Sequence, residues 1–170
     1  MGQYFLFICI LNDTFIQFIC NFCCEGGSKF LEMAYKNNKY MLRMEKLLSV
    51  DGLWHKQRVI LAGEYAEKER NRDFNLFTMT QCKSPVTSQN INPITVSDEY
   101  YAKEDEFRYI LNHDKGEYVD KQKCTKIHPL AILLEDGYNE GGEWKRQRIS
   151  VQNYIPENFV EYIIDESEYI

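Results

Sequence analysis

The chain has 170 residues, a length that suits one ordinary domain or two small lobes that share a core. With 44% hydrophobic and 27% charged residues, it is not a wholly disordered, collagen-like or coiled-coil protein. The formal net charge of −6 argues against a dedicated nucleic-acid binder, whose surface needs an excess of basic residues.

The first 19 residues predict a β-hairpin rather than a leader peptide or a membrane span. Residues 4–11 and 15–19 are rich in β-formers, and Asn12-Asp13-Thr14 between them favours a turn. No Lys or Arg precedes Lys29, although a signal peptide begins with basic residues. An aspartate near the bilayer centre would also disfavour a transmembrane helix. We therefore expect a cytoplasmic protein with no membrane association.

The six cysteines do not predict a disulfide framework or a metal site. Cys20, Cys23 and Cys24 form a cluster, but no second Cys/His pair follows at the spacing that structural zinc requires. We expect reduced thiols, most of them buried, with no metal and no cofactor.

After the hairpin, the first half predicts two helices and a strand. Gly26-Gly27-Ser28 opens a short helix with Ser28 as its N-cap, and residues 39–48 form a second helix with one apolar face. The segment Trp54–Ala62 is a predicted strand that ends at Gly63. Phe74–Thr80 could add one more strand before a polar, proline-containing linker over residues 81–106.

The second half predicts the same order of elements. Phe107–Leu111 and Glu117–Asp120 are strands around a turn, and Pro129 opens a short helix over Leu130–Leu134. Trp144–Val151 is the closing strand, and residues 157–170 form an acidic tail that we expect to be solvated.

One sequence word occurs in both halves. Residues 52–60 read GLWHKQRVI and residues 142–149 read GEWKRQRI, which share Gly-x-Trp-x-x-Gln-Arg-aliphatic at a distance of 90 residues. Upstream, Ile10-Leu11-Asn12 matches Ile110-Leu111-Asn112. We therefore predict an α+β fold with an internal duplication of a ββαβ unit, a mainly antiparallel sheet and short helices packed on it. The first lobe spans residues 1–80 and the second spans residues 107–156, packed as one globular domain.

The repeated word contains the candidate ligand-binding residues. On a strand, each Trp would share a face with the basic residues two and four positions later, and we expect that face to be half exposed. An aromatic ring can stack on a base and Arg can bind phosphate in a bidentate manner. The alternative is structural, with Trp as an anchor and Arg paired to an acid. The six candidates are Trp54, Lys56, Arg58, Trp144, Arg146 and Arg148.

Catalytic motifs are mostly missing, so we assign no catalytic residue. The sequence contains no Gly-x-Ser-x-Gly, no P-loop and no His-Glu-x-x-His. Glu64, Glu135, Asp136 and His128 could act as acid or base only if burial or a neighbour changed their pKa. A hydrolase centred on Glu64, Asp136 or His128 would need a cleft with a carboxyl of raised pKa beside His128.

Several short motifs together resemble a widespread group of uncharacterised microbial proteins. Members of that group open with Met-Gly-Gln-Tyr-Phe/Trp and carry a Trp-x-x-Asp-Arg-aliphatic strand that leads to Gly-Asp-Tyr. The resemblance covers most of this chain, although Gln57 and Gln147 stand where the group has Asp, and Glu64 replaces a further Asp. It implies a shared fold and no reaction. The matching segments are Met1–Phe5, Arg58–Tyr65, Glu117–Asp120 and Ile127–Leu130.

These observations favour a non-enzymatic interaction or structural protein that acts through a protein partner or by self-association. The alternative is a small binding module for a nucleotide or another phosphorylated ligand, held by the repeated Trp/Arg strands.

Overall fold

The computed structural model describes residues 3–12, 15–19, 27–70, 74–81, 91–137 and 142–169. It has an α+β fold with a mixed sheet and a few short helices, as the sequence predicts at this level. The strands of the described part are β1 (Tyr4–Ile10), β2 (Ile16–Ile19), β3 (Ser28–Lys29), β4 (Gln57–Gly63), β5 (Ile91–Ile94), β6 (Tyr109–Asn112), β7 (Glu117–Asp120), β8 (Glu135–Asp136), β9 (Gln147–Gln152) and β10 (Val160–Glu161). The helices are α1 (Phe30–Met33), α2 (Lys39–Leu48), α3 (Leu76–Met79) and α4 (Pro129–Leu134), with 3₁₀ turns at Lys121–Lys123 and Glu166–Tyr169.

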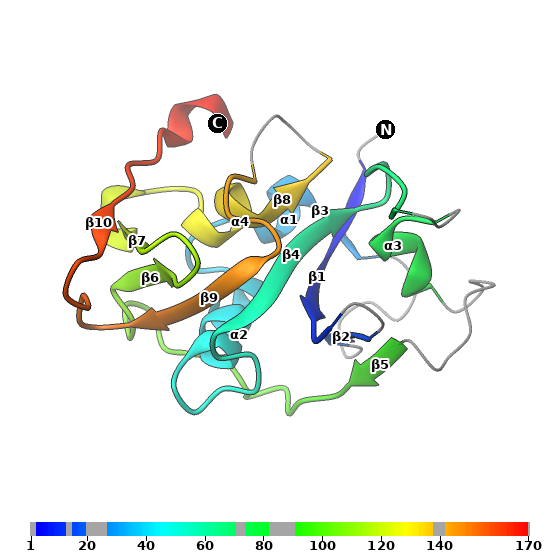
Figure 1. The fold of residues 1–170 in the computed structure, drawn as a ribbon, viewed down its shortest axis with the longest axis horizontal. Helices are drawn as coiled ribbons and strands as arrows, with labels where there is room; N and C mark the ends of the chain where they lie inside the picture. The colour runs from blue at the N-terminus through cyan, green and yellow to red at the C-terminus, as the bar shows by residue number, and fades with distance from the viewer. Residues whose placement is uncertain are drawn as a thin grey trace.

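The strands form one sheet with β4 and β9 at its centre. The order along the sheet is β10-β7-β6-β9-β4-β1-β2-β5, with β3 paired to β1 and β8 paired to β4 (Figure 1). The inner neighbours are antiparallel, whereas both edge strands run parallel to their neighbours, β5 to β2 and β10 to β7. The two edges of the sheet are therefore built in the same way.

The core has two layers, one on each face of the sheet. Residues of α1, α2 and α4 pack with Phe5, Phe7, Val59 and Ile149 on one face of the sheet. On the other face, α3 packs on the alternate residues of the same strands, among them Leu6, Ile8 and Ile60. Because successive strand residues point to opposite faces, the first half of the sheet is buried on both sides.

Helix α2 has the bounds that the sequence predicts. Asn38 caps its first turn, since the side-chain oxygen accepts a hydrogen bond of 2.8 Å from the backbone N–H of Tyr40. At the start of α4, His128 Nδ1 accepts from the N–H of Leu130 at 3.1 Å, and Pro129 occupies the first helical position.

Four predicted features differ from the structure. Both central strands begin three residues late, because Lys56 (φ 57°) and Arg146 (φ 67°) adopt the left-handed conformation before β4 and β9 start. The segment predicted as a strand at Phe74–Thr80 contains α3, whose first turn Asn75 caps by accepting from Thr78 N–H at 2.8 Å. Ser28 is not a helix N-cap but pairs with Phe5 in β3.

Parts of the predicted linker and tail belong to the sheet. Residues 91–94 of the linker form β5, whose Pro93 is tolerated because β5 is an edge strand. The tail contributes β10 and then returns to the body, where the carboxylate of Glu166 accepts hydrogen bonds from the backbone N–H groups of residues 125–127. The tail is thus docked rather than solvated.

Candidate functional site

The four basic residues of the two repeated words lie side by side at the centre of the sheet. Strands β4 and β9 are antiparallel, with Arg58 directly opposite Arg148 and with Gln57 opposite Ile149. Lys56 and Arg146 precede the strands, and their backbone N–H groups donate to Ile149 at 3.0 Å and to Val59 at 2.9 Å. We call Lys56, Arg58, Arg146 and Arg148 the basic strip.

The basic strip lies on the face of the sheet opposite α2 and α4. Val59 and Ile149 belong to the core beneath these helices, so the neighbouring Arg58 and Arg148 point to the other side. In Figure 1, β4 and β9 cross the front of the molecule and α2 lies behind them. All four side chains of the strip are exposed to solvent.

Of the two opposed arginines of the basic strip, Arg148 has an acidic partner and Arg58 has none among the described residues. Arg146 bonds both carboxylate oxygens of Glu69 at 2.8 Å, and Arg148 bonds Asp114 at 3.1 Å. Within the described part of the chain, Arg58 makes no ion pair, although it faces Arg148 across the ladder. Like charges at directly opposed positions destabilise an antiparallel sheet. An anion beside Arg58 would give it the acidic partner that Arg148 already has.

His113 lies near Lys56, at one end of the strip. Burial lowers the pKa of His113, and the nearby Lys56 and His55 lower it further, against a weaker opposite effect of Asp114. The ring nitrogen Nε2 of His113 lies 2.6 Å from the hydroxyl of Ser150. His113 therefore favours its neutral form and provides hydrogen-bonding capacity rather than charge.

The two tryptophans are not on the exposed face, so this part of the sequence expectation is wrong. Trp54 and Trp144 are fully buried in the helix-side core, because the turns at Lys56 and Arg146 separate them from the strands that follow. The indole Nε1 of Trp54 donates to the side-chain oxygen of Gln17 at 2.7 Å. Buried indoles cannot stack on a ligand at the surface. The structure thus brings together four of the six predicted residues and assigns the other two to the core; whether the basic residues bind a ligand stays a prediction.

The acid and base candidates do not form a cleft around His128. Its Nε2 lies 3.0 Å from the carboxylate of Glu45, which also pairs with Lys121, and all three side chains are buried. Burial by itself would raise the pKa of Glu45, but the hydrogen bonds and charges of His128 and Lys121 lower it overall. The pKa of His128 is lowered by burial. The carboxyl beside His128 thus has a lowered pKa, whereas the hydrolase hypothesis needs a raised one.

The remaining acid and base candidates lie elsewhere. Asp136 pairs with Lys145 at 3.2 Å, and Glu64 raises the pKa of the exposed Tyr65. Glu135 is fully buried. Glu45 was not among the residues predicted from the sequence, although a carboxylate among the buried apolar positions of a helix was an available signal.

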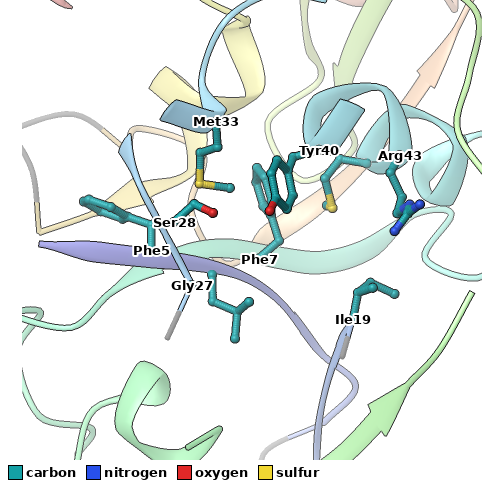
Figure 2. A pocket seen from close by; sticks show the side chains of 10 residues that line it. Phe5, Phe7, Ile19, Gly27, Ser28, Met33, Tyr40 and Arg43 are labelled. Carbon is teal, nitrogen blue, oxygen red and sulfur yellow. The ribbon is translucent and has the colours of Figure 1, made fainter. Parts of the chain in front are cut away.

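A separate pocket between β1 and α2 is too small to be the site. Figure 2 shows Phe5, Phe7, Met33 and Tyr40 around it, and its free volume is about 30 Å³. That volume would hold about one water molecule, and the lining is almost entirely apolar.

The thiols and acidic groups do not indicate a metal site in the described ranges. No group of three His, Cys, Asp or Glu side chains there has the arrangement to hold a metal ion. Cys9 and Cys124 are free and buried, and burial raises their pKa to about 12 and about 11. The cluster of Cys20, Cys23 and Cys24 lies outside the described residues. None of the described helices is long and apolar enough to span a membrane.

Comparison with known proteins adds no family. No family model, no curated protein and no solved structure matches the chain. The resemblance to the uncharacterised microbial group therefore stays a prediction from the motifs.

Proposed function

We propose that this chain is a non-enzymatic binding protein, built from two copies of one unit, that holds an anionic group of its partner on the basic strip. The observation that carries the binding role is the exposed, opposed pair of Arg58 and Arg148.

The strand pairing supports the duplication. If residues 57–59 correspond to residues 147–149, an exchange of the two copies must leave the ladder between β4 and β9 unchanged. Gln57 pairs with Ile149, Arg58 with Arg148 and Val59 with Gln147, as this rule requires. The bonds from Lys56 N–H to Ile149 and from Arg146 N–H to Val59 obey the same rule. The sheet order obeys it too. From the centre outwards, the strands are β4, β1, β2 and β5 on one side and β9, β6, β7 and β10 on the other, so corresponding strands hold the same place.

A second pairing on the helix side supports the same symmetry. Tyr35 bridges Ile127, with His128 N–H donating to Ala34 at 2.7 Å and Lys36 N–H donating to Lys126 at 2.9 Å. Exchanging the two copies converts each of these two hydrogen bonds into the other. The sheet registers favour a different alignment of the first hairpin from the one read in the sequence. Cys9 pairs with Val59 and Asn112 with Ile149, so Cys9, rather than Asn12, corresponds to Asn112.

The chemistry of the strip favours a phosphate group over a carboxylate as the anion. Two adjacent guanidinium groups offer several N–H donors, which suits an anion with three or more acceptor oxygens and a charge above one. The existing pairs with Asp114 and Glu69 orient Arg148 and Arg146, while Arg58 stays available. The protein partner of our first hypothesis could carry this group on a phosphorylated side chain, and a nucleotide could carry it in the alternative.

Titration with pyrophosphate tests the proposal directly. We expect saturable binding in calorimetry, together with shifts of the Arg58 and Arg148 side-chain Nε–H resonances in NMR spectra. Replacing Arg58 with Gln should weaken binding about tenfold, because a hydrogen bond to a charged group contributes about 1.5 kcal/mol or more. Lys103→Gln is the matched control, since it removes one exposed charge away from the strip. Equal affinity of the Arg58→Gln and Lys103→Gln variants would refute the assignment.

A further inference from the structure

A larger pocket lies between α4 and the segment that follows β10. Its volume is about 390 Å³, and its walls include Ile132 of α4 with Tyr162 and Ile163 after β10. Three carboxylates, those of Glu143, Asp165 and Glu168, also line it. No basic side chain is among the described residues of the lining. We call this the tail pocket.

The corresponding place in the first half is occupied by a lysine. The N–H of Trp54 donates to Leu47 near the end of α2, and the N–H of Trp144 donates to Leu133 near the end of α4. Lys46 therefore corresponds to Ile132, since each precedes the accepting leucine by one residue. The Nζ of Lys46 lies 4.6 Å from the centre of the Tyr100 ring, in a cation–π contact.

The turns after the two edge strands identify the counterpart of Tyr100. Ser97 Oγ accepts from Glu99 N–H at 3.2 Å, and Asp165 Oδ1 accepts from Ser167 N–H at 3.0 Å. Asn92 and Val160 pair with the corresponding residues Gln17 and Glu117, and each turn begins five residues later. Val96 and Ile164, which precede the turns, pack against the same core. Glu168 thus corresponds to Tyr100. At these two positions the first half has Tyr100 and Lys46, whereas the second half has Glu168 and Ile132.

Trp144 lies next to the tail pocket and can report on its occupancy. Its side chain is fully buried, and its ring lies 5.7 Å from that of Tyr162, which lines the tail pocket. Among the described groups, neither Trp144 Nε1 nor the buried Oε1 of Glu117 has a hydrogen-bond partner. The equivalent Trp54 Nε1 is satisfied by Gln17.

We propose that the tail pocket binds the ammonium end of an alkylamine, in the place that Lys46 fills in the other half. The aliphatic walls suit a chain of methylene groups, as they do for the stem of a buried lysine. Tyr162 offers a ring face for the cation, and Glu143 and Glu168 offer charge without a described basic partner. The source of the ammonium is either a free polyamine or a lysine of a partner protein. The inference rests on the correspondence between the halves, but not on anion binding, because the basic strip lies on the opposite face of the sheet.

Cadaverine, which has the ammonium and methylene chain of lysine, is a suitable probe. We would label the full chain with fluorotryptophan and assign the two resonances with Trp54→Phe. The Trp144 resonance should shift saturably with cadaverine, whereas the Trp54 resonance should not. Pentanol should shift neither. Equal shifts with pentanol, or equal shifts of both indoles, would overturn the proposal.

Variants separate the pocket from general charge effects. Glu168→Gln should weaken cadaverine binding about fivefold, the upper range for an exposed ion pair. Glu157→Gln removes an exposed charge from the same segment outside the pocket and should leave binding unchanged. Ile132→Lys supplies the ammonium from within, so it should abolish binding and unfold at or above the wild-type temperature. Equal binding by the two glutamine variants, or a large loss of stability in Ile132→Lys, would contradict the proposal.

A competition experiment separates the two sources of the ammonium group. A lysine-containing peptide that competes with cadaverine would favour a partner protein as the source, and failure to compete would favour a free polyamine.

Discussion

The docking of the C-terminal segment depends on one carboxylate, that of Glu166. One of its oxygens accepts from Thr125 N–H at 2.8 Å and from the Thr125 hydroxyl at 2.9 Å. The other accepts from the N–H groups of Lys126 and Ile127, each at 3.0 Å. Burial alone would raise the pKa of Glu166, but these hydrogen bonds lower it to about 2. The charged form therefore stabilises the fold.

The size of this stabilisation follows from the pKa difference between the folded and unfolded chain. A carboxyl whose pKa falls from 4.5 to about 2 contributes roughly 3.4 kcal/mol at neutral pH. Because Glu166 is only partly buried, solvent screening reduces this to about 2 kcal/mol. The contribution is complete above the unfolded pKa and is lost as the pH falls from 4.5 towards 2.

Replacing Glu166 with Gln should therefore lower the free energy of unfolding by about 2 kcal/mol at pH 7. An amide keeps one acceptor oxygen but turns an NH₂ group towards backbone donors. Urea denaturation at a series of pH values measures the effect, with Glu157→Gln as the control on the same segment. The difference between the variant and the wild type should shrink to near zero by about pH 2. A difference that is independent of pH, or equal losses in the two variants, would refute the reasoning.

Three further substitutions test other contacts through the free energy of unfolding. Glu45→Gln should cost about 3 kcal/mol or more, because it leaves Lys121 charged and buried without its partner. Lys56→Gly should stabilise the fold by about 0.5 kcal/mol, since glycine adopts the left-handed conformation (φ 57°) without strain. Gln17→Leu should cost about 2 kcal/mol, because the buried Nε1 of Trp54 then has no acceptor.

Each of these substitutions has a matched comparison. Combining Glu45→Leu with Lys121→Met should cost less than Glu45→Gln alone; a greater cost would mean that the ion pair is net stabilising. Lys115→Gly, at an exposed turn position without positive φ, should not stabilise the fold, and equal gains would exclude relief of backbone strain. Glu117 is the residue that the proposed duplication aligns with Gln17. Glu117→Leu should cost under about 1 kcal/mol, because Trp144 Nε1 has no hydrogen-bond partner among the described residues. Equal costs for Gln17→Leu and Glu117→Leu would contradict the assigned hydrogen bond.

The elements that depend on local chemistry could be predicted from the sequence. Helix α2 and strand β7 have their predicted bounds, since apolar periodicity, the cap at Asn38 and the turn before Glu117 act within a few residues. The start of β4 could not be predicted this way. Trp54 and Lys56 both suit a strand, and only the pairing with β9 holds Lys56 at a positive φ.

The candidate sites depend on contacts between residues far apart in the chain. The repeated word singled out Arg58 and Arg148 as candidate residues, but only the strand register puts them opposite each other. The same holds for Glu45, which meets Lys121 and His128 across more than 70 residues of chain. The sequence by itself thus determined the class of fold, the α2 helix and the identity of the basic residues, because local preferences decide these. Which side chains are buried, opposed or unpartnered was decided by the tertiary structure, because burial and pairing depend on segments that local sequence does not bring together.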